Sequence, residues 1–382
     1  MKRKLCLLLS AIFVLGVLLI PTNKVVCYAS FSSEVNYKSA VLIDKNSKQI
    51  LFENNVNERV PIASVTKLMT VLLTLEQVKS GSLNLTDKIM VSPNASGMGG
   101  SQVFLDANAE YEAGELLKSV IVASANDSSV ALAEHIAGSE ANFVRMMNEK
   151  ANEIGLKNTN YSNCTGLPTN DGVSSAYDQA IVLSYVLDFE DYHTYSSIWL
   201  EDFAHPNGRT TQMTNTNKLS RFYSGCIGGK TGSTNQAKYC LAVGAERGGT
   251  ELIAVVLGAE TSKDRFKLAS DLLNYGFDNF VSTTLFSQEN LKDVNVKIKG
   301  KNRIANLKAE KSYSITHEKG KQPNFSLEFN LPNMLTSVKE NEVVGNVEIV
   351  VDGVVVEKIN ILSTETVNEL SVWDYIKEIA SM

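Results

Sequence analysis

The chain has 382 residues, of which 44% are hydrophobic and 20% are charged. This composition excludes an intrinsically disordered protein, and the length favours two domains over one. The formal net charge of −6 gives no indication of a nucleic-acid partner.

The first thirty residues differ in character from the rest of the chain. Lys2, Arg3 and Lys4 precede the apolar run LCLLLSAIFVLGVLLI, and the small residues of CYAS follow. This order predicts a signal peptide over residues 1–29, and so an exported protein at the outer face of the cytoplasmic membrane or in the cell wall space. A retained membrane helix is the alternative, but the apolar run is short for spanning a bilayer.

The next part of the chain alternates between two kinds of pattern. SAVLIDKNSKQILFEN predicts a hairpin with its turn at Lys45–Lys48, and a helix that contains Ser64 follows and ends at Gly81. Apolar residues then recur at helical spacing from Gly114 to about Phe189. CIGGKTG, KYCLAVGAE and ELIAVVLGAE predict strands, and KDRFKLASDLLNYGF predicts a closing helix. Strands on both sides of a helical region predict an α+β fold with a mixed sheet packed by helices.

Beyond about Phe286 the pattern changes to short alternating strands, in VNVKIKG, FSLEFNL, GNVEIVVDG and VVVEKINIL. We therefore expect one domain over residues 30–283, a small all-β domain over 284–364, and an amphipathic helix over 365–382. Leu370, Trp373, Ile376 and Ile379 form the apolar side of that helix, which is either a membrane-surface anchor or docked on the β domain. Its acidic residues outnumber Lys377, which disfavours anionic lipid.

Ser64 and Lys67 lie three residues apart at the start of an apolar run, in PIASVTKLMT. Ser64 is the only serine in the chain with lysine at the third position after it. An amine one helical turn away could take the serine proton and create a nucleophile. The structural alternative is a serine that caps the helix and a lysine on its surface.

Two further motifs follow in the chain. Ser124 and Asn126 form an SxN motif in a polar break between two predicted helices, where capping is the structural alternative. Lys230, Thr231 and Gly232 form a KTG motif on a predicted strand. SxxK, SxN and KTG in this order are the signature of penicillin-recognising serine enzymes.

The sequence resembles the low-molecular-mass penicillin-binding proteins that are serine-type D-alanyl-D-alanine carboxypeptidases. The resemblance covers roughly Tyr37 to Phe277. The β-rich tail and the predicted terminal helix of this chain are also similar to the family's second domain and its membrane-surface anchor. The resemblance is carried by RVPIASVTKLMT, GSQVFL, ASANDSSVALAEHIAGS, NTNYSNCTGLP, SSAYDQA, TNTNKL, GGKTGSTNQAKYCLAV and LIAVVLGA. It implies a β-lactamase/transpeptidase-like domain with an all-helical subdomain, and removal of the terminal D-alanine from peptidoglycan stem peptides.

The resemblance also implies a role for each motif residue. Ser64 would attack the carbonyl between two D-alanines, Lys67 would take its proton, and Ser124 would pass a proton to the leaving amine. Lys67 must be neutral for this role, and burial beside Lys230 would lower its pKa. The expected substrate-binding residues are Asn126, Lys230, Thr231, Gly232 and Ser233.

Within that binding set, Lys230 and Thr231 would hold the terminal carboxylate. Gly232 would leave room for the substrate. The backbone N–H groups of Ser64 and Ser233 would stabilise the oxyanion. No cofactor or metal is expected, because the sequence has neither CxxC nor HExxH.

Other functions remain as alternatives. A β-lactamase of class A needs a glutamate for hydrolysis, and Glu190 and Glu201 lie in no distinctive setting, so β-lactams are expected to acylate Ser64 and remain bound as inhibitors. D,D-endopeptidase activity and a catalytically inert wall-binding module are further alternatives. A Ser-His-Asp hydrolase is disfavoured because GxSxG is absent.

Three cysteines follow the predicted signal peptide. If the strands that contain Cys226 and Cys240 pair around a turn near Ser233, these two residues lie opposite each other and could form a disulfide. The alternative is that both are free cysteines in the core. Cys164 is expected to remain a thiol.

Overall fold

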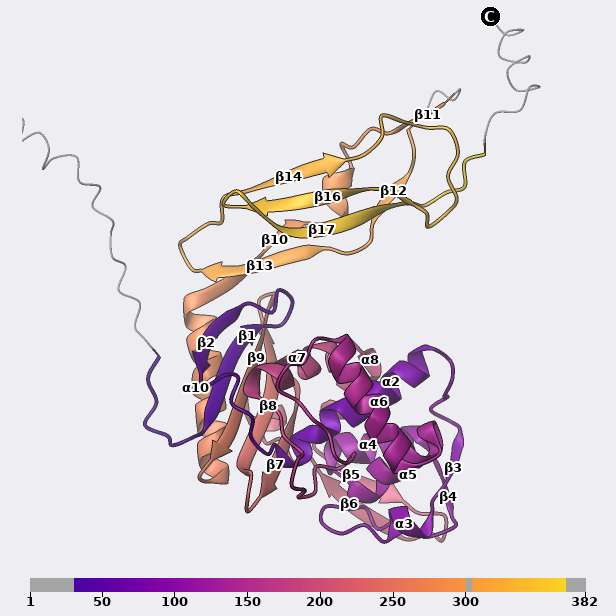
Figure 1. Cartoon of the computed structure of the whole chain (residues 1–382), viewed down its shortest axis with the longest axis vertical. Coiled ribbons are helices and arrows are strands. Elements are labelled where there is room, and N and C mark those ends of the chain that lie inside the picture. Colours follow the sequence, from indigo (N-terminus) through magenta and orange to yellow (C-terminus); the bar gives the residue numbers. More distant parts are fainter. Residues whose placement is uncertain (1–30, 300–303, 369–382) are drawn as a thin grey trace, which may run out of the picture. The chain divides into compact units, whose positions relative to one another are not determined.

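The computed structural model describes residues 31–299 and 304–368 (Figure 1). The predicted signal peptide and the apolar residues of the predicted terminal helix lie outside these residues. Within the described ranges, no helix is both long enough and apolar enough to cross a membrane.

A five-stranded sheet forms the centre of the first domain, in the order β2-β1-β9-β8-β7. Its strands are β1 (Ser39–Asp44), β2 (Ile50–Asn54), β7 (Cys226–Thr234), β8 (Lys238–Arg247) and β9 (Thr250–Ala259). Every neighbouring pair is antiparallel. The predicted β1–β2 hairpin and the predicted strands of the KTG region are confirmed. β7 lies at an edge of the sheet, so the KTG motif has one side free of strand neighbours.

Helices cover both faces of this sheet. α10 (Ser262–Asn279) packs on β8 and β9, while α7 (Ala176–Val186) packs on β1, β8 and β9 from the other side (Figure 1). The remaining helices are α2 (Lys67–Lys79), α3 (Pro93–Ser96), α4 (Ala113–Val122), α5 (Asn126–Ala137), α6 (Glu140–Glu153), α8 (Glu190–Ser196) and α9 (Leu219–Phe222). The buried apolar side of α2 includes Leu68, Leu72 and Leu75, as the periodicity predicts.

The helix predicted to contain Ser64 is divided. A 3-10 turn, η1 (Ala63–Thr66), carries Ser64, and the α-helix begins at Lys67. Ala63 has φ of 49°, a left-handed conformation that an alanine seldom adopts. Such strain concentrates at functional sites, and here it directly precedes Ser64.

Two small two-stranded sheets were not predicted from the sequence pattern. They are β3 (Lys88–Met90) with β4 (Glu110–Glu112), and β5 (Leu200–Ala204) with β6 (Thr210–Thr214). β3 and β4 have three residues each, which is too short for an alternation to be recognised. β5 and β6 are mostly polar, with Phe203 and Met213 as their buried residues.

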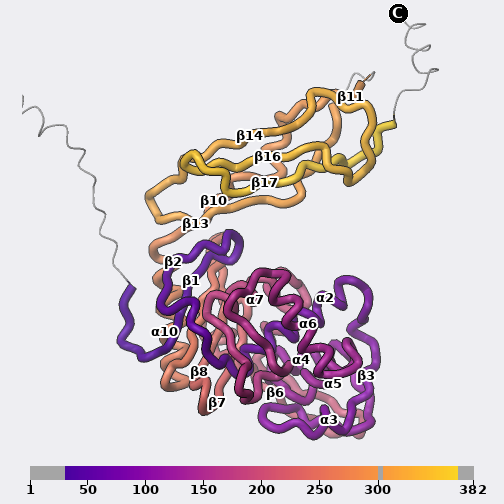
Figure 2. Tube along the Cα trace, in the orientation of Figure 1, coloured from indigo at the N-terminus to yellow at the C-terminus, as the bar shows by residue number. Residues whose placement is uncertain are grey.

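The β-rich part is built from β10 (Phe280–Phe286), η2 (Gln288–Leu291), β11 (Lys297–Ile298), β12 (Leu307–Ala309), β13 (Tyr313–Glu318), β14 (Phe325–Asn330), β15 (Met334–Leu335), β16 (Val343–Val351) and β17 (Val354–Ser363) (Figure 2). Its four-stranded sheet has the order β12-β17-β16-β14. Asp352 and Gly353 both have positive φ in the β16–β17 turn, as a two-residue hairpin of type I′ requires. Its apolar clusters are separate from the core of the first domain.

Of the two possibilities for Cys226 and Cys240, the disulfide is wrong and the free cysteines are confirmed. Cys226 lies opposite Ala245, and Cys240 lies opposite Gly232. The turn between β7 and β8 occupies residues 235–237 and not the position near Ser233, which moves the register by several residues. All three cysteines of the described ranges are free in the structure.

Candidate active site

Lys67 is the buried centre of the site, with 0% of its surface exposed. Its Nζ lies 3.1 Å from Ser64 Oγ, 2.5 Å from Asn126 Oδ1 and 2.6 Å from the carbonyl oxygen of Thr165. The structural alternative of a capping serine and a surface lysine is therefore wrong, since neither η1 nor α2 has a side-chain cap.

Burial lowers the pKa of Lys67 to about 7. The Asp127 carboxylate acts in the opposite direction on this pKa. A lysine with this pKa is partly neutral near pH 7, whereas an exposed lysine is almost fully protonated there.

The SxN motif lies in the short connection from α4 to α5. Ser124 has φ of 63°, which turns the chain sharply, and Asn126 is the first residue of α5. Both side chains are buried. Neither residue caps the helix, because α5 has no side-chain cap. The Asn126 amide instead joins Lys67 to the loop at residues 99–101.

The KTG motif brings a second buried lysine to the site. Lys230 Nζ donates to Ser124 Oγ over 2.7 Å, and to the carbonyl oxygen of Thr231 over 3.2 Å. Burial, with smaller contributions from the Lys67 and Arg265 charges, holds the pKa of Lys230 well below its usual value. Two lysines thus lie close together with little solvent, which favours loss of a proton from one of them.

The structure gives a packing reason for Gly232, beside the expected room for the substrate. A Cβ at this position would lie 2.6 Å from the carbonyl oxygen of Ile62 and 2.9 Å from the Ser64 nitrogen. Gly166 approaches the same turn, where its Cβ would also lie 2.9 Å from the Ser64 nitrogen. The two glycines therefore let β7 and the 162–167 loop close around the backbone of Ser64.

The structure brings the predicted site residues of all three motifs together at the edge strand β7. Ser64, Lys67 and Asn126 form one connected group, and Ser124 and Lys230 form another. Thr231 is buried beside Lys230, whereas the Ser233 side chain is exposed.

The sequence did not reveal two groups that make contacts in the site. The carbonyl oxygen of Thr165 contacts Lys67, and the buried Arg265 donates to the carbonyl oxygens of Gly232 and Cys240 over 2.9 and 3.2 Å. A backbone carbonyl leaves no signal in residue type. Arg265 lies in α10, where nothing in the helical pattern distinguishes it from a surface arginine.

Comparison with known proteins agrees with this geometry. The family model described as D-alanyl-D-alanine carboxypeptidase matches residues 26–261, and the model of the penicillin-binding protein 5 C-terminal domain matches residues 280–369.

Two relatives and one solved structure illustrate the similarity. The D-alanyl-D-alanine carboxypeptidase DacF of Bacillus subtilis is 42% identical over 289 residues, which cover 75% of this chain and 74% of DacF. The D-alanyl-D-alanine carboxypeptidase DacA of Haemophilus influenzae is 33% identical over 359 residues, which cover 90% of this chain and 89% of DacA. The structure of penicillin-binding protein 5 from H. influenzae aligns with a TM-score of 0.70 and 31% identity, over 89% of this chain and 99% of that chain. The chain therefore belongs to the D-alanyl-D-alanine carboxypeptidase family of penicillin-binding serine peptidases.

Proposed function

We propose that Ser64 is the nucleophile of this carboxypeptidase and that neutral Lys67 is its general base. A neutral amine has two hydrogens and one lone pair. The carbonyl oxygens of Asn126 and Thr165 can only accept, so together they use both hydrogens. The lone pair is then left for the Ser64 hydroxyl at 3.1 Å. This three-point arrangement is the observation that carries the proposal.

Ser124 and Lys230 act on the leaving side of the reaction. When Ser64 attacks the carbonyl between the two D-alanines, the amine of the terminal D-alanine must gain a proton as it leaves. Ser124 Oγ can deliver that proton and recover one from Lys230, with which it shares a 2.7 Å hydrogen bond. Lys230 and Thr231 also supply a cation and a hydroxyl for the substrate carboxylate, and the Asn126 amide supplies a contact for the peptide.

The oxyanion of the tetrahedral intermediate binds the backbone N–H groups of Ser64 and Ser233. Ser64 lies in the first turn of η1, where N–H groups lack helical partners. The absence of a Cβ at Gly232 and Gly166 keeps this turn closely enclosed. Ser233 participates through its backbone, which agrees with its exposed side chain.

Water then hydrolyses the acyl-enzyme slowly when the acyl group comes from a β-lactam. Glu201, one of the two glutamates considered for such hydrolysis, forms an ion pair with Lys118, and Glu190 lies in the first turn of α8. Neither has a contact with the Ser64–Lys67 group. Penicillin is therefore an inhibitor of this enzyme and not a good substrate.

The test is incubation with a fluorescent penicillin, followed by peptide mapping and by measurement of D-alanine release from a peptide that ends in D-Ala-D-Ala. The expected result is one label on the peptide that contains Ser64, and loss of both label and D-alanine release in Ser64→Ala. Label on another peptide, or D-alanine release by Ser64→Ala, would contradict the serine mechanism.

We also propose an exported enzyme at the outer face of the cytoplasmic membrane. The proposal rests on the charged and apolar order of residues 1–29 and on the amphipathic pattern of residues 365–382. The substrate supports it, because assembled peptidoglycan lies outside that membrane.

A further inference from the structure

The loop at residues 99–106 holds the Asn126 amide in one orientation. The Asn126 backbone N–H donates to the carbonyl oxygen of Ser101 over 2.7 Å, and its Nδ2 donates to the carbonyl oxygen of Gly99 over 2.7 Å. The amide nitrogen is thus committed to the loop, which leaves Oδ1 for Lys67. A Cβ on Gly100 would lie 2.8 Å from the same Nδ2, so the loop lies as close to Asn126 as a backbone allows.

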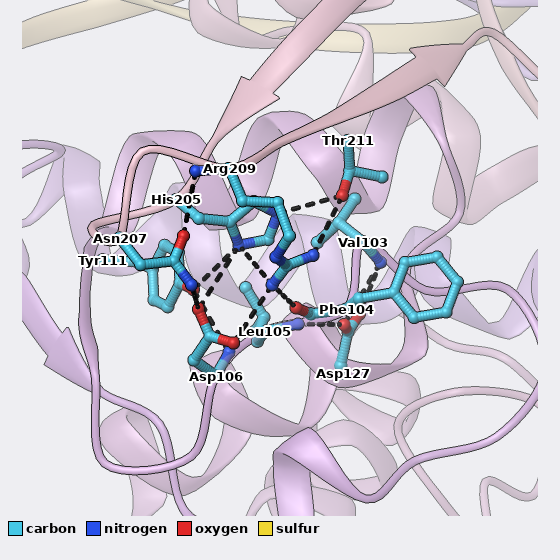
Figure 3. Close-up of polar contacts among 10 residues, drawn as sticks. All are labelled: Val103, Phe104, Leu105, Asp106, Tyr111, Asp127, His205, Asn207, Arg209 and Thr211. Carbon is cyan, nitrogen blue, oxygen red and sulfur yellow. Dashed lines mark hydrogen bonds and ion pairs between the residues drawn. The ribbon is translucent and has the colours of Figure 1, made fainter.

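Asp127 fastens this loop to the start of α5 (Figure 3). Its carboxylate is fully buried, and its Oδ2 accepts from the backbone N–H groups of Val103 and Leu105, each over 3.1 Å. Phe104 lies between these two donors with φ of 63°, a strained conformation for an aromatic residue. The loop therefore adopts this path because the carboxylate binds both N–H groups.

Arg209 supports the loop from its other side, in the turn between β5 and β6 (Figure 3). Its Nη2 donates to the carbonyl oxygen of Phe104 over 2.6 Å and to Asp106 Oδ1 over 3.1 Å. Asn207 of the same turn donates to Asp106 Oδ2 over 3.0 Å. Phe104 is thus held in two ways. Asp127 binds the N–H groups of the residues before and after it, and Arg209 binds its own carbonyl oxygen.

We propose that Asp127 is a positioning residue of the catalytic site, which directs Asn126 Oδ1 toward Lys67 by holding the 99–106 loop, with Arg209 as the outer support. The inference rests on the proposed role of Lys67. Neither Asp127 nor Arg209 contacts the reacting atoms, so each acts through Asn126. Misplacement of a catalytic contact by about 1 Å can lower a rate about 100-fold.

The charge of Asp127 provides a separate measurable signature. Asp127 raises the pKa of Lys67 against the effect of burial. Other charged groups also lie near Lys67. Lys230 on β7 and Arg265 on α10 are cations, and Glu140 accepts a hydrogen bond from the Cys164 thiol. Arg209, Asp106 and His205 are the charged and titratable groups in contact with one another around the 99–106 loop. Removal of the Asp127 charge alone leaves Lys67 with a lower pKa than before.

The decisive variant is Asp127→Asn, measured as the second-order rate constant of acylation by fluorescent penicillin between pH 5 and 9. Asp178→Asn is the matched control. Asp178 is also a buried carboxylate in the first helical turn, of α7, and also holds a loop, by accepting from Asn158 N–H and the Thr159 hydroxyl over 2.7 Å each. Both variants lose a buried negative charge of the same structural kind, but only Asp127 acts on Lys67.

The expected result for Asp127→Asn is an acylation rate constant about 10- to 100-fold lower, with the midpoint of its rise with pH moved to lower pH. Asp178→Asn is expected to keep the wild-type midpoint. An Asp127→Asn rate within threefold of wild type, or a loss with an unchanged midpoint, overturns the inference. Failure of the wild-type enzyme to label at Ser64 would instead overturn the proposed function.

Arg209→Met keeps the test decisive if Asp127→Asn does not fold. It removes the outer support and leaves the Asp127 charge, so acylation is expected to slow about 3- to 10-fold with an unchanged midpoint. Circular dichroism confirms folding at the assay temperature. A folded Arg209→Met enzyme that acylates at the wild-type rate contradicts the proposal.

Discussion

Lys230 Nζ and Ser124 Oγ share a 2.7 Å hydrogen bond across the site, although they are 106 residues apart in the chain. Both side chains are buried, and Ser124 is held toward Lys230 by a backbone turn with φ of 63°. The pair connects the helical subdomain to the edge strand of the sheet.

Ser124→Ala is expected to lower kcat for D-alanine release about 100- to 10,000-fold, the range for loss of positioned proton transfer. Lys230→Met is expected to cost a similar amount, since it also removes the cation that we propose binds the substrate carboxylate. Because the two residues act as a unit, the double variant should be little worse than the worse single variant. Fully multiplicative losses, measured by steady-state kinetics, would show that the hydrogen bond is not functional.

Acylation is expected to depend on pH through Lys67. The proposed base must be unprotonated to act, and the pKa of Lys67 is lowered to about 7. The acylation rate constant should therefore fall about tenfold per pH unit below pH 7 and level off above it, up to the titration of other groups. Stopped-flow measurement with a chromogenic β-lactam tests this profile. A profile flat from pH 5 to 8 would show that Lys67 is not the base.

Lys67→Arg provides the corresponding variant. Arginine keeps the positive charge but does not lose its proton in proteins. We expect acylation at least 100-fold slower than in the wild type, as in Lys67→Met. Activity of Lys67→Arg near the wild-type level would mean that charge, and not proton transfer, is what the site requires.

The side chains of the site could be predicted from the sequence, because SxxK, SxN and KTG each place a hydroxyl or an amine at a fixed spacing at the start of a helix, in a turn or on a strand. Contributions from the backbone could not. The carbonyl oxygens of Thr165 and Gly99 depend on loop geometry that any residue could provide. The close approach of Gly232 to the backbone of Ser64 is likewise visible only in the structure, while its predicted role in substrate access stays a prediction.

The larger pattern of the fold followed from periodicity, and the errors came from register and short elements. Moving the β7–β8 turn from near Ser233 to residues 235–237 was enough to separate Cys226 from Cys240. The β5–β6 hairpin, which carries Arg209, is too polar for alternation to reveal. Tertiary contacts decide such features, and a single sequence does not contain them explicitly.

The mature protein is expected to have three free thiols. Cys164 and Cys240 are fully buried, and burial raises the pKa of each thiol, to about 11 for Cys240. Titration with a thiol reagent in unreduced denaturant should give three equivalents, and slow partial reaction in the native state. One equivalent would indicate a disulfide and contradict the register of β7 and β8.

The membrane proposal is tested by deletion of residues 367–382. The mature full-length protein is expected to co-sediment with vesicles of zwitterionic phospholipid, and less with anionic ones, because Glu369, Asp374 and Glu378 repel them. The shortened protein is expected to remain in the supernatant with its penicillin binding intact. Equal sedimentation of the two forms would show that this segment is not an anchor.

Gly232→Ala tests the close approach of the KTG strand to the nucleophile. The added methyl group would meet backbone atoms of Ile62 and Ser64, which cannot move aside as a flexible side chain can. We therefore expect a destabilisation of about 1–3 kcal/mol, as for overpacking elsewhere, together with a large loss of acylation. Gly244→Ala in β8 is the control, since its Cβ would meet the Leu187 side chain at 2.6 Å, away from Ser64. It should lose stability on thermal unfolding but acylate Ser64 at the wild-type rate. If Gly232→Ala also acylates normally, the spacing between β7 and the Ser64 turn does not control formation of the acyl-enzyme.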